Sequence, residues 1–157
     1  MTPAAELVAL LLKKGQILAT AESCTGGMVA ASVTDIAGSS AVFDRGFVTY
    51  SNAAKCEMLA VPLKLLETFG GVSEQVAMSM AQGALAHSAA TISIAITGIA
   101  GPTGGSETKP MGLVHFAVAQ KPGKSISDKQ IFKGDRERVR IQARDHAVQM
   151  LGKALVG

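Results

Sequence analysis

The most constraining feature of this chain is a short run of small and hydroxyl residues between an apolar stretch and a helical pattern. The apolar stretch is Gln16 to Thr20, the run is Ala21-Glu22-Ser23-Cys24-Thr25-Gly26-Gly27, and the helical pattern is Met28 to Ile36. This order predicts a strand, a tight turn and a helix that opens on glycine. The unpaired backbone N–H groups at the start of such a helix carry a partial positive charge, so they bind phosphate, carboxylate or an oxyanion.

The simpler interpretation of this turn is a strand-to-helix connection capped by a Ser or Thr side chain. Two adjacent glycines, Gly26 and Gly27, favour a functional turn, because glycine is costly inside a helix and marks close backbone approach. Ser23, Cys24 and Thr25 add two hydroxyls and a thiol at the same place. We therefore expect this turn to take part in catalysis or ligand binding.

Residues 1–157 are expected to form a single domain, because 157 residues with 48% hydrophobic content can bury a substantial core. We expect no membrane partner, since no run approaches the roughly 18 uninterrupted apolar residues of a membrane span. The start, Met-Thr-Pro, lacks the basic region of a signal peptide, which predicts a cytoplasmic protein.

Nucleic acid is not an expected partner either. The net charge is only +3 and aromatic residues make up 4% of the chain, whereas nucleic-acid-binding proteins concentrate basic and often aromatic side chains on one face. Two cysteines, Cys24 and Cys56, and three histidines, His87, His115 and His146, show no spacing typical of a metal site. We therefore expect neither a metal nor a cofactor.

Alternating periodicities predict the fold. Helices are expected over about 3–14, 28–36, 53–59, 73–87 and 135 onward, and strands over 16–20, 41–50, 91–97, 111–119 and 125–133. Asp44, Arg45 and Gly46 predict a bulge or an edge position for the second strand. The predicted fold class is α/β: a layered α/β/α single domain with a mixed, mostly parallel sheet and a C-terminal β-hairpin plus helix.

Polar groups follow three strands of this scheme. Ser23 follows the first strand, Lys55 the second, and Thr97 with the glycine-rich stretch Gly98–Gly105 the third. Parallel strands end at one edge of a sheet, where ligands of α/β proteins gather, so these groups are expected to converge. Ser40 lies at the opposite end of the second strand, roughly 30 Å from Lys55, unless a partner subunit supplies it.

A serine beside a lysine is a known nucleophile and base pair, which makes Ser23 and Lys55 candidate catalytic residues. The base must be an uncharged amine, yet an ordinary lysine is neutral in only about one molecule in 2,500 at pH 7. The flanking Ala53, Ala54 and Cys56 permit the desolvation that would lower the pKa of this lysine. The alternative is an ordinary surface lysine.

Cys24 is a second candidate nucleophile, because a thiol at a helix N-terminus can have a lowered pKa; the alternative is a small buried thiol. Arg136, Arg140 and Arg144 recur at every fourth position of the last helix and are expected to form a solvated face. Arg136 is the exception. A cation in the first turn opposes the helix dipole, which suggests that it faces an anion.

Several further motifs accompany the Ser23 turn. They are Ile36-Ala37-Gly38-Ser39-Ser40, Gly46-Phe47-Val48-Thr49-Tyr50-Ser51-Asn52 with Lys55, Thr97-Gly98-Ile99-Ala100-Gly101-Pro102, and Gly134-Asp135-Arg136. In this order they resemble the CinA C-terminal domain family, from about residue 5 to 155. The chain is similar to the stand-alone form, without the N-terminal molybdopterin-binding-like domain of CinA proteins.

The resemblance implies a nicotinamide-nucleotide amidohydrolase, which converts nicotinamide mononucleotide (NMN) and water to nicotinate mononucleotide and ammonia with a Ser/Lys dyad. It implies Ser23 as nucleophile and Lys55 as base, with Tyr50 and Thr97 as polar neighbours. Both Ser23 and Ser40 lie in the motifs, and the position at the sheet edge favours Ser23. The residues expected to bind substrate are Thr25, Gly26, Gly27, Ser40, Gly98, Gly101, Gly104, Gly105 and Arg136.

Within this set, the backbone N–H groups of Thr25–Gly27 or of the glycine-rich stretch are expected to hold the oxyanion. Gly101–Gly105 and Arg136 are expected to hold the phosphate. Two other functions compete: a non-catalytic nucleotide-binding or accessory module related to competence or DNA-damage response, and a hydrolase that uses Cys24. The family is also compatible with a homodimer.

Overall fold

The computed structural model describes residues 1–157 as an α/β domain. In chain order its elements are α1 (Pro3–Lys14), β1 (Leu18–Glu22), α2 (Met28–Thr34), η1 (Ser39–Ala41), β2 (Phe43–Val48), α3 (Asn52–Leu59), α4 (Leu63–Phe69), α5 (Glu74–Ala86), β3 (Ile92–Gly98), β4 (Leu113–Gln120), β5 (Ile126–Ile131) and α6 (Arg136–Val156). None of the helices combines the length and the apolar character that crossing a bilayer requires.

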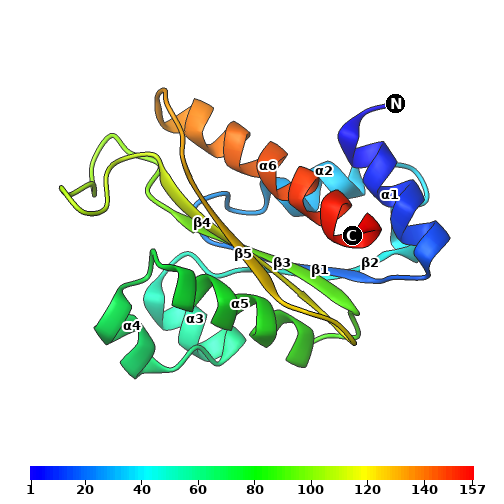
Figure 1. The fold of residues 1–157 in the computed structure, drawn as a ribbon, viewed down its shortest axis with the longest axis horizontal. Coiled ribbons are helices and arrows are strands. Elements are labelled where there is room, and N and C mark those ends of the chain that lie inside the picture. The colour runs from blue at the N-terminus through cyan, green and yellow to red at the C-terminus, as the bar shows by residue number, and fades with distance from the viewer.

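The five strands form one sheet in the order β2-β1-β3-β4-β5. Strand β1 pairs in parallel with β2 and with β3, whereas β4 is antiparallel to both β3 and β5. Only β4 therefore runs against the other strands, which confirms the predicted mixed, mostly parallel sheet with a C-terminal hairpin and helix. Helices α1, α2 and α6 cover one face of the sheet, and α3, α4 and α5 cover the other (Figure 1).

Each face of the sheet buries its own core. Large side chains such as Ile94 and Phe116 pack under α1, α2 and α6. The opposite face presents small residues, including Ala95 and Ala117, to α5. Helix α5 in turn lies close to α3. The absence of a side chain at Gly83 permits this approach, since a Cβ there would collide with the carbonyl oxygen of Leu59. This close packing holds α3 against the sheet.

Local signals set most helix ends. The Thr2 hydroxyl caps α1, Gly15 ends α1 in the left-handed conformation, and Ser51, Ser73 and Asp135 cap α3, α5 and α6. Several predicted element boundaries were wrong by two residues, and α4 was not among the predicted helices. Strand β1 extends to Glu22, helix α2 stops at Thr34, and β2 is shorter than the predicted range 41–50.

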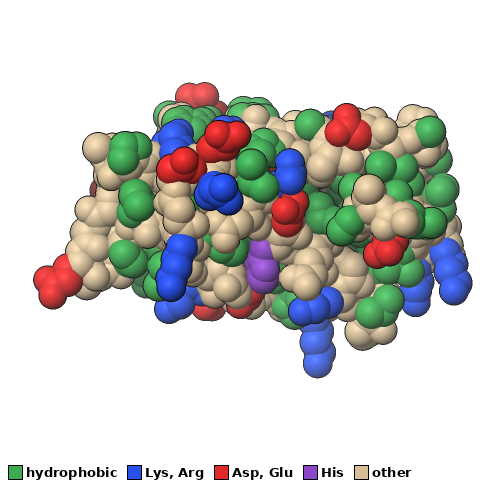
Figure 2. All heavy atoms as spheres, turned by 90° about the horizontal axis from the view of Figure 1, so that it is seen from above, with side chains coloured by type: hydrophobic (Ala, Val, Ile, Leu, Met, Phe, Trp, Pro, Cys, Tyr) green, Lys and Arg blue, Asp and Glu red, His purple; other side chains and the backbone are tan.

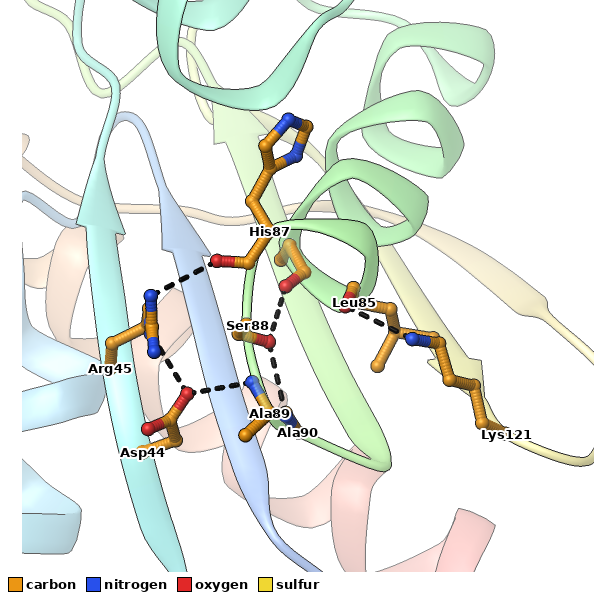
Figure 3. Close-up of polar contacts among 9 residues, drawn as sticks. Asp44, Arg45, Leu85, His87, Ser88, Ala89, Ala90 and Lys121 are labelled. Carbon is orange, nitrogen blue, oxygen red and sulfur yellow. Dashed lines mark hydrogen bonds and ion pairs between the residues drawn. The ribbon is translucent and has the colours of Figure 1, made fainter.

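Strand β2 occupies an edge of the sheet and contains a bulge, as predicted. Leu18 lies opposite Phe43, but Ala19 lies opposite Arg45, so Asp44 is the extra residue. The Asp44 carboxylate accepts hydrogen bonds from Arg45 and from the Ala89 N–H, while Arg45 also donates to the His87 carbonyl (Figure 3). These contacts tie the edge strand to the end of α5, at the opposite end of the sheet from Ser23.

Acidic, basic and apolar side chains are interspersed on the surface formed by α1, α2 and α6 (Figure 2). The surface charge of this face is thus mixed in sign.

Candidate active site

A cleft of about 340 Å³ lies at the carboxyl ends of β1, β2 and β3. The predicted convergence of polar groups at this edge of the sheet is therefore observed. Eight of the predicted site residues line the cleft: Ser23, Tyr50, Lys55, Thr97, Gly98, Gly101, Gly104 and Arg136.

Ser23 and Lys55 are in direct contact inside this cleft. The Nζ of Lys55 lies 3.0 Å from the Oγ of Ser23. Both atoms also lie 3.3 Å from the backbone carbonyl oxygen of Tyr50. Ser23 is 7% exposed and Lys55 only 2%, so the pair is shielded from solvent. Ser23 directly follows β1 of the sheet, and Lys55 lies in α3, on one face of the sheet.

The environment of Lys55 favours the neutral amine. Burial lowers the pKa of Lys55 from its ordinary value, because water no longer solvates the ammonium form. None of the ion pairs in the structure involves Lys55, so no carboxylate restores the charge. The alternative of an ordinary surface lysine is wrong, and a buried amine next to a hydroxyl is chemically suited to act as a base.

Cys24 also lines the cleft, but its thiol is poorly suited to nucleophilic attack. Burial raises the pKa of Cys24 to about 11, despite the nearby Arg140 guanidinium, which acts in the opposite direction. The thiol therefore remains protonated at neutral pH, and the reactive form of a cysteine is the thiolate. This observation disfavours a cysteine-based hydrolase.

The N-terminus of α2 does not face the cleft with free N–H groups, contrary to the expectation from the glycine-opened helix. The buried carboxylate of Glu22 accepts hydrogen bonds from the N–H groups of Val29 and Ala30 at 2.9 and 3.0 Å, and from the Thr25 hydroxyl at 2.6 Å. An internal anion therefore occupies this end of the helix. An acidic residue at the end of a buried strand, just before the glycines, was the sequence signal for it.

Other backbone donors are available next to Ser23. The N–H groups of Cys24, Ala100 and Gly101, three residues that line the cleft, donate to no other residue of the protein. Donors of this kind stabilise an oxyanion when they point at the reacting carbonyl. Residues of the glycine-rich stretch thus line the cleft, whereas Thr25, Gly26 and Gly27 do not.

Arg136 crosses the mouth of the cleft from the start of α6. One guanidinium nitrogen donates to the carbonyl of Gly101 at 2.8 Å, and another donates to the Tyr50 hydroxyl at 2.9 Å. Both acceptors are neutral and no ion pair involves Arg136, so its positive charge is uncompensated. Tyr50 is 61% exposed, and its side chain meets Arg136 while its carbonyl contacts the Ser23–Lys55 pair.

The solvated-face interpretation fails for Arg140, which donates to the carbonyls of Cys24 and Thr25 at 3.0 and 3.3 Å. Arg140 therefore holds the turn that follows Ser23 from the side of α6. Arg144 instead pairs with its neighbour Asp145 near the surface.

Thr97 is buried, and its hydroxyl donates to the carbonyl of Gly71 at 2.7 Å. Ser40 lies in η1, before β2, and the structure does not bring it to the cleft. Gly105 also lies outside the lining.

Sequence reasoning missed Asn52 and Gly71 as cleft residues. The available signal was that Asn52 precedes Lys55 by three residues on a helix, which places both on one side.

The model of the CinA C-terminal domain family matches residues 1–155. The chain belongs to the CinA C-terminal domain family. Among curated members, the nicotinamide-nucleotide amidohydrolase PncC of Enterobacter agglomerans is 54% identical over 144 residues, which cover 92% of this chain and 88% of that protein. PncC of Escherichia coli K12 is 53% identical over 141 residues, covering 90% and 86%.

Other members of the family are longer. The CinA-like protein of Anaeromyxobacter dehalogenans is 49% identical over 149 residues, which cover 95% of this chain but 36% of that protein. The fold is also shared with solved structures. The competence/damage inducible protein CihA of Agrobacterium tumefaciens has a TM-score of 0.92 and 45% identity, covering 100% of this chain and 98% of that chain. A CinA superfamily protein of Klebsiella pneumoniae has a TM-score of 0.94 and 38% identity, covering 98% and 96%.

Proposed function

We propose that this protein hydrolyses the carboxamide of NMN to nicotinate mononucleotide and ammonia, with Ser23 as nucleophile and Lys55 as general base. The observation that carries the mechanism is the 3.0 Å contact between the Ser23 hydroxyl and a buried lysine that has no carboxylate partner. The substrate is supported by the curated relatives that are named nicotinamide-nucleotide amidohydrolase PncC. The match covers 88% and 86% of the length of these two proteins.

The reaction proceeds in two halves. In the first, the neutral amine of Lys55 takes the Ser23 proton while Oγ attacks the carboxamide carbon, and the resulting ammonium then protonates the amide nitrogen, so that the C–N bond breaks and ammonia leaves. In the second, Lys55 takes a proton from water as it attacks the acyl-serine ester, and the ammonium then returns that proton to Ser23 Oγ as the ester bond breaks and nicotinate mononucleotide is released. The N–H groups of Cys24, Ala100 and Gly101 are the donors that we assign to the oxyanion.

The charge of the cleft suits an anionic substrate. Its lining includes two basic side chains, Lys55 and Arg136, and no Asp or Glu. We assign the substrate phosphate to Arg136, because a guanidinium held only by neutral acceptors can add a charge-assisted hydrogen bond. Gly101 and Gly104 line the same cleft, in which Arg136 contacts the Gly101 carbonyl.

The decisive experiment measures ammonia release from NMN by the purified protein, with Ser23→Ala and Lys55→Ala variants whose folding is checked by circular dichroism. We expect release by the wild type and its near-complete loss in both variants. A folded wild type without turnover would leave the non-catalytic nucleotide-binding module as the better function. Unchanged rates in both folded variants would remove the dyad.

A further inference from the structure

Asn52, the first residue of α3, lines the same cleft as Ser23 and Lys55. It precedes Lys55 by three residues, so the two side chains project from one side of the helix. The hydrogen bonds at this end of α3 join the Ser51 hydroxyl to the Ala54 N–H and join Lys55 to its acceptors, and none involves the Asn52 side chain. The carboxamide of Asn52 thus offers a free acceptor and a free donor to the cleft.

The place of this carboxamide is set by Gly71. A Cβ on Gly71 would lie 2.5 Å from the Oδ1 and 3.6 Å from the Nδ2 of Asn52, so a side chain at position 71 would displace the amide. The Thr97 hydroxyl, at the end of β3, holds the Gly71 carbonyl at 2.7 Å. Thr97 and Gly71 together therefore form the wall against which the Asn52 amide rests.

Asn52 and Arg136 reach the cleft from opposite faces of the sheet, because α3 and α6 lie on opposite sides of it (Figure 1). Ser23 follows β1, in the layer between them. A substrate whose phosphate is bound by Arg136 and whose carboxamide carbon lies at Ser23 extends across this layer. Its amide nitrogen then lies on the side of Asn52.

We propose that the Asn52 carboxamide recognises the amide group that the reaction releases, an inference that rests on the proposed amidohydrolase function. Its Oδ1 accepts a hydrogen bond from the N–H of the substrate carboxamide. The product carboxylate has only acceptor oxygens and cannot make this hydrogen bond, which favours its release. Asn52 is in this scheme the residue that distinguishes an amide from an ester or an acid.

The test compares two substrates, NMN and the methyl ester of nicotinate mononucleotide, which lacks the N–H. For Asn52→Ala we expect kcat/KM to fall roughly 10- to 100-fold on NMN and to change less than about threefold on the ester, since a lost hydrogen bond costs about 1–3 kcal/mol. Gly71→Ala is expected to give the same amide-selective loss, because it displaces the Asn52 side chain. The double variant should lose little more than either single variant.

Glu57→Ala, on the exposed side of α3, is the matched control and should leave both rates and their ratio unchanged. Equal losses on the two substrates in Asn52→Ala would mean that Asn52 only supports the structure, and would overturn the inference. Unchanged kinetics on both would overturn it as well. A wild type that hydrolyses the ester but not NMN, or neither of them, would refute the proposed function itself, and the inference with it.

Discussion

Lys55 Nζ and Ser23 Oγ lie 3.0 Å apart, and both lie 3.3 Å from the backbone carbonyl oxygen of Tyr50. The acceptor that organises the pair is thus a main-chain atom just beyond the edge strand. Because no substitution at position 50 removes that carbonyl, tests of the pair must change the lysine, the serine or their surroundings.

The first prediction concerns the charge of the base. Lys55→Arg keeps a long cationic side chain, but a guanidinium does not deprotonate in proteins, so NMN hydrolysis should fall about 10²- to 10⁴-fold. The wild-type rate should rise with pH and level off above the lowered pKa of Lys55, which lies below the ordinary 10.5. A pH–rate profile of ammonia release measures both the loss of rate in Lys55→Arg and the rise of the wild-type rate with pH. An arginine variant with more than a tenth of wild-type activity would contradict this role.

The second prediction is that the dyad lowers stability. Burial disfavours the ammonium form of Lys55, so Lys55→Met should raise the free energy of unfolding at pH 7 by about 1 kcal/mol or more while abolishing activity. Below the lowered pKa of Lys55 the folded wild type carries the full penalty of a buried cation. Between that pKa and 10.5 the unfolded chain binds more protons than the folded one, so wild-type stability rises with pH.

Urea denaturation at pH 7 and pH 9.5 tests the direction of this pH dependence of stability. The stability difference between Lys55→Met and the wild type should be larger at the lower pH. A difference that grows with pH would show that the folded environment favours the charged amine.

The third prediction concerns Glu22. Glu22→Gln replaces one acceptor oxygen with a donor that faces backbone N–H groups, so the variant should lose about 1–3 kcal/mol of stability in urea denaturation. The negative charge of Glu22 also contributes to the raised pKa of Cys24, so the thiol of the variant should titrate at lower pH. A Cys24 titration that does not move would mean that the Glu22 charge does not act on the thiol of Cys24.

The fourth prediction separates the two arginines of α6. Arg136→Gln should reduce kcat/KM for NMN about 10- to 100-fold and leave nicotinamide riboside, which lacks the phosphate, nearly unaffected. Arg140→Gln should reduce both substrates by similar factors, because Arg140 braces the Cys24 and Thr25 carbonyls. If Arg136→Gln impairs the riboside as strongly as NMN, the phosphate is bound elsewhere.

The fifth prediction concerns thiol chemistry. With a pKa of about 11 and little exposure, Cys24 should react with iodoacetamide at pH 7.5 much more slowly than the half-buried Cys56. Mass spectrometry of alkylated peptides measures the two rates. Cys24→Ala should retain most of the NMN hydrolysis, and complete loss in a folded variant would revive the cysteine mechanism.

The order and type of the elements could be predicted from the sequence alone, as could the edge of the sheet to which Ser23, Lys55 and Thr97 come. These features depend on local signals: the Thr2 and Ser73 caps, the left-handed Gly15, the alternation of Ile92, Ile94 and Ile96. A parallel arrangement of the first three strands then brings their carboxyl ends together without further information.

Which groups occupy that edge, in contrast, depends on contacts that form only in the folded protein. The Glu22 carboxylate binds the N-terminus of α2, and Arg140 donates to the turn that follows Ser23. Asn52 lies against Gly71 in the cleft, whereas Ser40 lies at the far end of β2. With the exception of Glu22, each of these placements joins or separates residues that are far apart in the chain. Such contacts follow from strand order and from how closely the helices pack on the sheet, and neither is encoded in the periodicity of a single segment.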